Sequence, residues 1–503
     1  MVTSMVEVHT PRRSREMKLG VESILTFSGI VVNAALAFVI TWMIARGLGA
    51  GATGAFFLFT ALFMIATSVI SMGADTGLVR SLSHARAIDA SSQLRPTVRT
   101  AISPVIAVGA PISALLFVLS GPIAGWLAPG SDATGTVRLL SLALLPAALT
   151  AVLLAGSRGL GRIRTYTLVQ NLFIPICRLA LVAIAIWQLG TTSSVVWAWG
   201  TPLFIAAGIA ALTLTLQLRA ETSGTGGISS LEAKELKRRF WRFSLPRGGA
   251  VILERALDWA DVLLVIMLLG ARAGGIYGVV TRIVQAGNML ESALRIVLGP
   301  RLSAAVARDD RDAAARMYSQ VTQLLILGSW PFYLAVALYS DVILGIFGTE
   351  FTRGFWALVA LATAMAVKNT AGALQTVLLM TGRSTWQLRN KAIQLAVLLA
   401  LTPLLVLACG LTGAAIAFAV SVIVDTLLAS FQVHRALGFS VPVRAIMRAA
   451  VIPAAVVIGG SLVARALTAS SGTFAELAGL GAVLLVYAAA VLGAHRRGVI
   501  DVG

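Results

Sequence analysis

The chain has 503 residues, of which 58% are apolar and only 12% carry a charge, and its mean hydropathy is +0.89. This composition is that of a polytopic membrane protein and excludes a soluble enzyme with a single membrane anchor. The formal net charge of +19 does not indicate nucleic acid. The Lys and Arg residues lie in short segments between apolar runs, where they set orientation and contact lipid headgroups.

A basic N-terminal segment precedes the first apolar run. Arg12, Arg13, Arg15 and Lys18 come before a hydrophobic stretch that is too long for the core of a signal peptide and lacks a persuasive cleavage site. We therefore expect this stretch to remain in the protein as its first membrane helix.

Apolar segments of membrane-spanning length recur along the whole chain. A helix of about 20 residues crosses the hydrocarbon core, because each residue adds about 1.5 Å. By this criterion we expect about fourteen spans, at residues 22–45, 52–72, 100–121, 136–156, 166–188, 194–217, 246–270, 276–298, 318–341, 354–380, 391–409, 411–432, 447–467 and 474–494.

The Lys and Arg residues are distributed unequally between the two sides of these spans. About 30 of the 40 lie at the N-terminus or in every second loop after it, whereas the intervening loops hold about five. Because positively charged loops stay on the cytoplasmic side, we expect both termini and the linker at 218–245 to be cytoplasmic. The protein is then a multi-pass protein of the inner (plasma) membrane.

An internal repeat relates the two halves of the chain. LGAGATG at 48–54 is echoed by LGARAGG at 269–275, at an offset of 221 in the numbering. An offset of 220 aligns Ser120 with Ser340, which a one-residue insertion would explain. Each half holds six spans, and an even number returns the chain to its starting side, so the halves have parallel topology. The predicted fold is an all-α polytopic membrane protein with two six-helix lobes and two extra C-terminal helices.

The same layout predicts the domain boundaries. We expect an N-terminal lobe at 1–217, a cytoplasmic linker at 218–245, a C-terminal lobe at 246–432, and helices 13 and 14 with a cytoplasmic tail at 433–503. Residues 219–243 begin as a flexible Ser/Gly segment and end as a short basic amphipathic helix, whose basic face we expect on the inner leaflet.

The span at 246–270 carries an unusual set of charges for a membrane helix. Glu254, Asp258 and Asp261 lie within an arc of about 60° when residues are placed at about 100° intervals, and Arg255 lies about 100° away. An acid at mid-membrane costs about 2.5 to 3.5 kcal/mol on insertion scales, so these carboxylates are expected to face protein or an aqueous cavity. Either they form the working centre of a transporter, or neighbouring cations neutralise them as a structural staple.

Other polar residues within the spans extend this candidate substrate- or ion-binding cavity. Asn33 in the first span superposes on Glu254 through the repeat, and Glu291 and Arg295 are spaced i,i+4 in the eighth span. For each further residue a structural role is an open alternative. The set is completed by three ionisable residues in other spans: Lys368, Arg178 and Asp425.

The cysteines and histidines indicate no metal or cofactor site. Cys177 and Cys409 lie within apolar runs and are expected to be small core residues. The four histidines lie near or outside helix ends without ligand spacing, and no nucleotide-binding loop is evident. No cofactor, bound metal or ATP-driven pumping is therefore predicted.

Several short segments resemble those of a known transporter family. They are ARGLGAGATGAFFLF at 45–59, GADTGLVR at 73–80, LLGARAGGIYGVVTRI at 268–283 and GLTGAAIAF at 410–418. Their order and spacing are similar to those of polysaccharide and lipid-linked oligosaccharide flippases in the multidrug, oligosaccharidyl-lipid and polysaccharide (MOP) exporter superfamily. The two extra helices also resemble lipid II flippases, in which such helices help to form a groove for the lipid tail.

The resemblance implies two lobes around a central cavity and the outward transfer, by alternating access, of a polyprenyl-pyrophosphate-linked oligosaccharide for cell-surface polysaccharide biosynthesis. The implied partners are membrane lipids, a proton or sodium as coupling ion and glycan-assembly proteins, without nucleic acid. Cavities of this family tend to be cationic, but here five buried bases face five buried acids, which indicates that some acids carry a coupling cation or proton. The bases are Arg178, Arg255, Arg282, Arg295 and Lys368.

Two other functions are alternatives. A cation-coupled multidrug antiporter of the same superfamily would also use a carboxylate-rich cavity. A membrane glycan polymerase or ligase would need a sizeable outer loop with His, Arg or acids, whereas the longest predicted outer loops have about fifteen residues and almost no charge. The sequence therefore predicts a transporter and not an enzyme.

Overall fold

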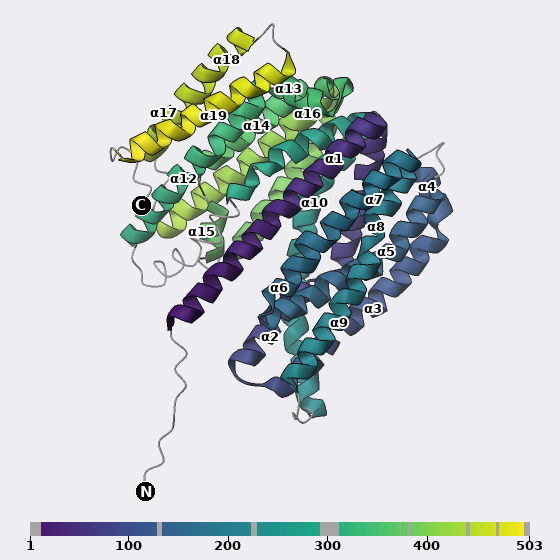
Figure 1. The fold of residues 1–503 in the computed structure, drawn as a ribbon. Coiled ribbons are helices and arrows are strands. Elements are labelled where there is room, and N and C mark those ends of the chain that lie inside the picture. Colours follow the sequence, from purple (N-terminus) through teal and green to yellow (C-terminus); the bar gives the residue numbers. More distant parts are fainter. Residues whose placement is uncertain are drawn as a thin grey trace. The chain divides into compact units, whose positions relative to one another are not determined.

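The computed structural model describes residues 12–127, 133–222, 229–291, 311–372, 374–380, 384–438, 443–468 and 472–496, and every regular element in these ranges is helical (Figure 1). The elements of the first half are α1 (Arg12–Ser71), α2 (Ala74–Ala87), η1 (Ser91–Gln93), α3 (Leu94–Val118), α4 (Ser120–Leu127), α5 (Thr134–Gly159), α6 (Ile163–Tyr166), η2 (Thr167–Phe173), α7 (Ile174–Gln188), α8 (Thr192–Gly200) and α9 (Pro202–Glu221). Those of the second half are α10 (Ser230–Ala286), α12 (Arg311–Leu338), α13 (Ser340–Phe347), η3 (Thr349–Gly354), α14 (Phe355–Thr370), α15 (Leu374–Met380), α16 (Ser384–Leu437), α17 (Val443–Pro453), η4 (Ala454–Gly459), α18 (Gly460–Thr468) and α19 (Thr473–Arg496).

Eleven helical segments of the described residues are long and apolar enough to cross a membrane. Three of them coincide largely with α1, α10 and α16, in which a glycine interrupts the helical backbone angles at Gly49, Gly270 and Gly410. The chain folds back at these points. A Cβ atom on Gly274 would touch the side chain of Ile266, eight residues earlier, which a straight helix would hold about 12 Å away. Divided at these three glycines, the eleven segments give fourteen helical arms in the described residues, in agreement with the predicted number of about fourteen spans, and the all-α polytopic fold is confirmed.

The internal repeat is visible in the backbone geometry. Gly49 has φ 80° and ψ 179°, and Gly270, its counterpart in the repeat, has φ 85° and ψ 170°. These angles are open to glycine but strained for a residue with a Cβ atom. Similarly, α3 ends at Val118 before the short helix α4, and α12 ends at Leu338 before the equally short α13, in the same register that aligns Ser120 with Ser340.

The repeated turns also pack against each other through small residues. A Cβ atom on Gly54 would overlap the carbonyl oxygen of Ala271, and a Cβ atom on Gly275 would overlap the carbonyl oxygen of Ala50. The repeat aligns Gly54 with Gly275 and Ala50 with Ala271, so this packing has the local two-fold symmetry that a parallel repeat predicts. Small residues allow this close backbone approach between membrane helices.

Packing divides the chain into two compact units, which are described separately. Unit 1 comprises Met1–Ile40, Ala66–Leu189 and Ser193–Val251, and unit 2 comprises Thr41–Ile65, Gly190–Thr192 and Ile252–Gly503. In unit 1, α5 is buried along most of its length and packs against α2, α3 and α9. In unit 2, α14 packs against α12 and α16, and α17 and α19 lie along α12 (Figure 1).

Unit 2 takes in a segment that belongs to the first lobe of the predicted division. Residues 41–65 pack with 252–503, although the sequence assigns them to the lobe at 1–217. The close contacts of the repeated turns give the physical reason, because they fix the second arm of α1 to α10. The lobe boundaries at 1–217, 218–245, 246–432 and 433–503 stay a prediction.

The structure differs from the predicted span at 354–380. α14 ends at Thr370, Gly372 has φ 72°, and a new helix, α15, begins at Leu374. At this break the hydroxyl of Tyr318 donates a hydrogen bond to the carbonyl oxygen of Ala371, which has lost its helical partner. Lys368 consequently lies in the last turn of α14 and not near the middle of a long helix.

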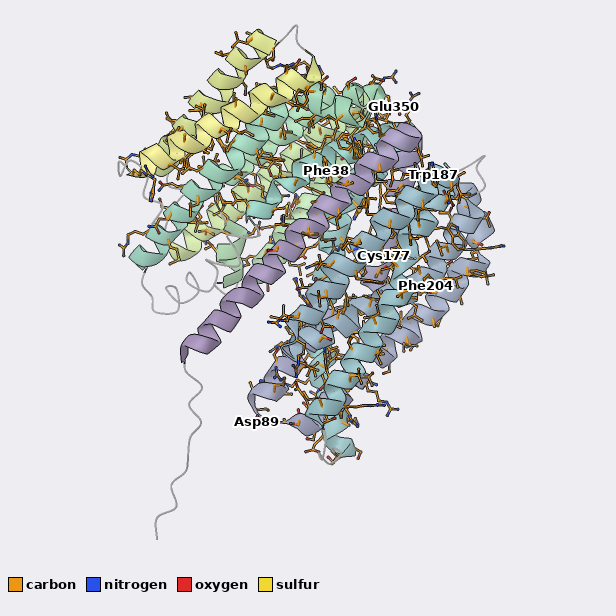
Figure 2. All side chains as sticks on the ribbon, in the orientation of Figure 1. Phe38, Asp89, Cys177, Trp187, Phe204 and Glu350 are labelled. Atoms are coloured by element: carbon orange, nitrogen blue, oxygen red, sulfur yellow. The ribbon has the colours of Figure 1, made fainter. Side chains whose placement is uncertain are left out.

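The two cysteines have different environments. Cys177, labelled on α7 in Figure 2, is partly buried, whereas Cys409 is exposed. The prediction that both are core residues is wrong for Cys409. An apolar thiol on a membrane helix needs no protein cover, because lipid is as apolar as a core.

Candidate functional site

A cavity of about 520 Å³ lies among the helices of unit 2. It is lined by residues of α10, α14 and α16, by Asn288, which follows α10, and by Met64 of α1. Four acids and four bases line it: Glu254, Asp258, Asp261, Asp425, Arg255, Arg282, Lys368 and Lys391. Charges of both signs therefore meet within membrane-spanning helices, where an isolated charge would be costly.

The three acids of α10 differ in their exposure. Asp261 is 3% exposed, and Tyr277 of the second arm of α10 lies beside it. The side chain of Asp258 is half exposed and forms an ion pair of 3.4 Å with Arg255, three residues before it. Glu254 lies one turn before Asp258 on the same cavity wall. The structure thus places the predicted acidic stripe along one wall of the cavity.

Arg282, on the second arm of α10, is held over two aromatic rings. Its guanidinium carbon lies 4.0 Å from the ring centre of Trp259 and 5.7 Å from that of Phe57. Its Nη1 donates a hydrogen bond of 2.8 Å to Oε1 of Gln285. Stacking fixes the plane of a guanidinium and leaves its remaining N–H groups for an anion.

Lys368 and Glu291 form an ion pair that the sequence does not predict. Nζ of Lys368 lies 2.8 Å from Oε2 of Glu291. The i,i+4 spacing predicts instead a pair between Glu291 and Arg295, a residue outside the described ranges. Helical spacing detects only partners on one helix, whereas Lys368 and Glu291 are 77 positions apart.

Lys391 and Asp425 form a more buried pair. Nζ of Lys391 lies 2.8 Å from Oδ2 of Asp425, whose side chain is 4% exposed. Lys391 also donates to Oε1 of Gln394 at 2.8 Å, and both carboxylate oxygens of Asp425 accept from Nε2 of Gln375 at 3.0 Å. An ammonium group and an amide therefore satisfy this carboxylate, as a buried charge requires.

Two predicted site residues lie in unit 1 and do not line this cavity. Asn33 is partly buried in α1. Nε of Arg178 donates a hydrogen bond of 2.9 Å to the carbonyl oxygen of Trp199, and its guanidinium carbon lies 3.8 Å from the centre of the Trp199 ring. Neutral groups therefore hold Arg178, and it does not line the cavity of unit 2, so a structural role is favoured for it.

The predicted site residues omit six polar residues that line the cavity: Thr281, Arg282, Gln285, Asn288, Lys391 and Gln394. Arg282 counts among the predicted buried bases but not among the predicted site residues. Lys391 falls at the predicted end of a span, where a cation usually anchors to headgroups. The i,i+3 spacing of Lys391 and Gln394 on one helical face is the signal that could have identified them.

A second charged contact in unit 2 joins the repeated turns. Glu350 of η3, labelled in Figure 2, accepts a hydrogen bond of 2.5 Å from the amide of Ala50 and forms an ion pair of 2.8 Å with Arg272. Ala50 and Arg272 begin the second arms of α1 and α10, where free amides carry partial positive charge. One carboxylate therefore ties the two turns together.

Solved structures share the fold of this protein. The structure is similar to the lipid II flippase MurJ in an inward closed conformation, with a TM-score of 0.69 at 12% identity, covering 96% of this chain and 100% of that one. It is also similar to an inward-facing multidrug resistance MATE transporter of the MOP superfamily, with a TM-score of 0.68 at 13% identity, covering 80% of this chain and 94% of that one. The chain therefore has the fold of the MOP membrane transporters.

The sequence comparisons identify the particular family. The family described as Polysaccharide biosynthesis protein matches residues 19–306, more than half of the chain, and the chain belongs to it. The chain is 25% identical over 430 residues to the Haloferax volcanii protein named "Probable low-salt glycan biosynthesis flippase Agl15", covering 82% of this chain and 83% of that protein. The predicted resemblance is confirmed, and the family is one of membrane flippases and not of enzymes.

Proposed function

We propose that this protein moves a polyprenyl-pyrophosphate-linked oligosaccharide from the cytoplasmic to the outer leaflet by alternating access, coupled to a proton or sodium, for cell-surface polysaccharide biosynthesis. The observation that carries the proposal is the cavity of unit 2, with four bases and four acids among membrane helices, in a chain of this family. A relative named as a probable glycan biosynthesis flippase supports a lipid-linked glycan as the substrate.

The bases of the cavity suit a pyrophosphate. Charge-assisted hydrogen bonds to phosphate oxygens are about twice as strong as neutral ones. Three cavity bases are paired with carboxylates, so an entering pyrophosphate would take the place of a carboxylate on a base that is already positioned. The pairs are Arg255–Asp258, Lys368–Glu291 and Lys391–Asp425.

The displaced carboxylates then need another partner. An unpaired carboxylate in a low-dielectric site is costly, and it binds a proton or a cation instead. We assign this coupling role to Asp258, and we extend it to Asp261, a buried carboxylate that lines the same cavity. Asp258 is half exposed, and its ion pair with Arg255 is the longest of the three in the cavity. Asp261 is buried beside Tyr277, without an ion pair among the described residues.

The orientation of the chain is part of the proposal. Both termini and the linker at 218–245 are placed in the cytoplasm because most Lys and Arg residues lie on that side. In a variant without native cysteines, single cysteines at positions 190 and 412 should react with an impermeant thiol reagent from outside intact cells. Labelling of a cysteine at position 224 under the same conditions would contradict this orientation.

A deletion strain tests the transported substrate. Loss of the protein should block surface glycan export while lipid-linked precursors accumulate on the cytoplasmic leaflet, and the wild-type gene should restore both. A strain that lacks the precursors altogether would indicate a role in their synthesis, and would contradict the proposal.

A cation-coupled multidrug antiporter is the second candidate. The four carboxylates of the cavity would suit a cationic drug, and the fold is shared with a MATE transporter. Unchanged surface glycan together with increased sensitivity to cationic drugs in the deletion strain would favour this function.

A further inference from the structure

A separate cavity of about 450 Å³ lies in unit 1. It is lined by α2, by η1 and the start of α3, and by residues 232–243 at the start of α10. Its polar lining includes groups of both signs: Arg80, His84, Glu232, Glu235 and Arg239. The transport cavity of unit 2 shares none of these residues.

Arg80 is fixed in this cavity but keeps its hydrogen-bond donors. Its guanidinium carbon lies 4.1 Å from the centre of the Phe243 ring. Within the described ranges, no hydrogen bond or ion pair engages the N–H groups of Arg80. A guanidinium that is stacked on an aromatic face and has free donors is preorganised for a phosphate group.

The cavity wall is tightly packed. A Cβ atom on Gly77 would overlap Oγ of Ser244 and approach the Phe240 ring, and a Cβ atom on Gly73 would overlap the carbonyl oxygen of Ser244. Phe240 is 3% exposed and forms part of the lining. The backbones of α2 and the start of α10 therefore approach each other closely. The charged side chains that line the cavity are carried by tightly packed helices.

The position of the cavity matches the membrane–water interface. α2 follows the second span, α3 begins the third, and residues 230–245 precede the seventh, and these three points lie on the same predicted side. Trp241 and Phe243, which are partly buried, supply aromatic residues that are typical of headgroup level. A cavity at this level would be open to lipid headgroups.

The acids of the lining determine which headgroup fits. Oε2 of Glu232 accepts a hydrogen bond of 2.7 Å from the amide of Ser229, which commits this carboxylate to the start of the helix. Glu235 has no such partner among the described residues and lines the cavity with Arg80 and Arg239. The cavity thus offers bases for a phosphate and a free carboxylate for a positive group.

We propose that this cavity binds the headgroup of a zwitterionic phospholipid that carries a primary ammonium group. The phosphodiester binds Arg80 and Arg239, and the ammonium group binds Glu235. The inference is independent of the transported substrate, because the site and its ligand differ from those of the transport cavity.

Binding of short-chain lipids to the purified full chain tests the site. The probes are dioctanoyl phosphatidylethanolamine, dioctanoyl phosphatidylglycerol and inorganic phosphate, with native mass spectrometry as the readout. Wild-type protein should bind the ethanolamine lipid in a saturable way and more tightly than the glycerol lipid. Arg80→Ala should weaken both lipids by about tenfold, since one charge-assisted contact is lost. Glu235→Gln should weaken only the ethanolamine lipid.

Matched variants distinguish binding in this cavity from nonspecific attraction of lipid phosphates to the basic helix. Arg238→Ala and Arg242→Ala remove the same charge from the same helix, but neither residue lines the cavity, so both should bind the lipids within about twofold of wild type. Phe243→Leu keeps every charge and removes the platform of Arg80, so it should weaken phosphate binding. Thermal unfolding of each variant shows that it is folded.

Three outcomes would overturn the proposal. Equal loss in Arg80→Ala and Arg238→Ala would indicate nonspecific attraction of phosphates. An unchanged lipid preference in Glu235→Gln would remove the ammonium site. Competition by inorganic phosphate at the same concentration as the lipid would assign the bases to a soluble phosphate.

Discussion

Two groups of charges lie within membrane-spanning helices of this chain, and they are satisfied in different ways. In the cavity of unit 2, Lys391 is paired with the carboxylate of Asp425. In unit 1, Arg178 is held by the ring and the carbonyl oxygen of Trp199. A base held by a carboxylate can exchange that partner for an anionic substrate, whereas a base held by neutral groups has no charged partner to release. A charge in a span is therefore better evidence of a transport site when groups of opposite charge line the same cavity, as they do around Lys391 and Arg282.

Two ion pairs within the cavity of unit 2 differ in how far they are exposed. The Lys391–Asp425 pair is largely buried, with side chains 24% and 4% exposed, whereas those of Arg255 and Asp258 are 50% and 51% exposed. Exposed pairs contribute little to stability, but breaking a buried pair leaves an uncompensated charge. The first pair should therefore matter for folding as well as transport, and the second mainly for transport.

The largest expected effect follows from breaking the buried pair. Asp425→Asn leaves the Lys391 ammonium without its carboxylate, and loss of one partner of a buried pair costs about 3 to 5 kcal/mol. The variant should unfold at a markedly lower temperature in detergent and export no glycan. The double variant Lys391→Met/Asp425→Leu removes both charges and should recover most of the stability without recovering transport. If Asp425→Asn unfolds at the wild-type temperature, the Lys391–Asp425 pair does not stabilise unit 2.

The next prediction concerns variants that should lose transport but fold normally. Asp258→Asn and Asp261→Asn preserve side-chain shape and remove the charge that the coupling proposal requires. Each should abolish glycan export in a complementation assay while expression and membrane insertion stay normal. If both variants export glycan at wild-type rates across about pH 6 to 8, the acidic stripe is structural and the coupling assignment is wrong.

Disrupting the close packing of the repeated turns should cause a smaller loss of stability. Gly54→Ala and Gly275→Ala place a Cβ atom against a backbone carbonyl group, and overpacking of this kind costs about 1 to 3 kcal/mol. Gly51→Ala is the matched control, because a Cβ atom there meets nothing within 4 Å. It should leave the unfolding temperature unchanged or raise it slightly. Equal behaviour of the three variants would contradict the close approach of α1 and α10.

The smallest expected loss of stability comes from replacing either of two stacked arginines. Arg178 stacks on Trp199 in unit 1, and Arg282 stacks on Trp259 in the cavity. Replacement of either by Met should cost about 1 kcal/mol, the typical contribution of a cation–π contact and one hydrogen bond. Arg178→Met should export glycan within about twofold of wild type, whereas Arg282→Met should lose most export. Similar export by both variants would contradict the assignment of Arg178 to a structural role and of Arg282 to transport.

The sequence by itself determined the number of spans and the internal repeat. Hydropathy is a local property, and lipid forces every apolar segment of sufficient length into a helix with its own backbone hydrogen bonds. The same reasoning placed Glu254, Asp258 and Asp261 on one face, because helical spacing alone sets that arrangement. The alignment of LGAGATG with LGARAGG likewise anticipated the matching angles of Gly49 and Gly270.

The tertiary structure alone decided which charges meet. Glu291 pairs with Lys368 on another helix, and Lys391 enters the cavity from the end of a predicted span. Arg178 has the same local sequence character as the cavity bases, but the helices around it provide an indole ring and a carbonyl group in place of an acid. The partner of a charged side chain depends on the packing of helices far apart in the sequence, and no periodicity within one helix encodes it.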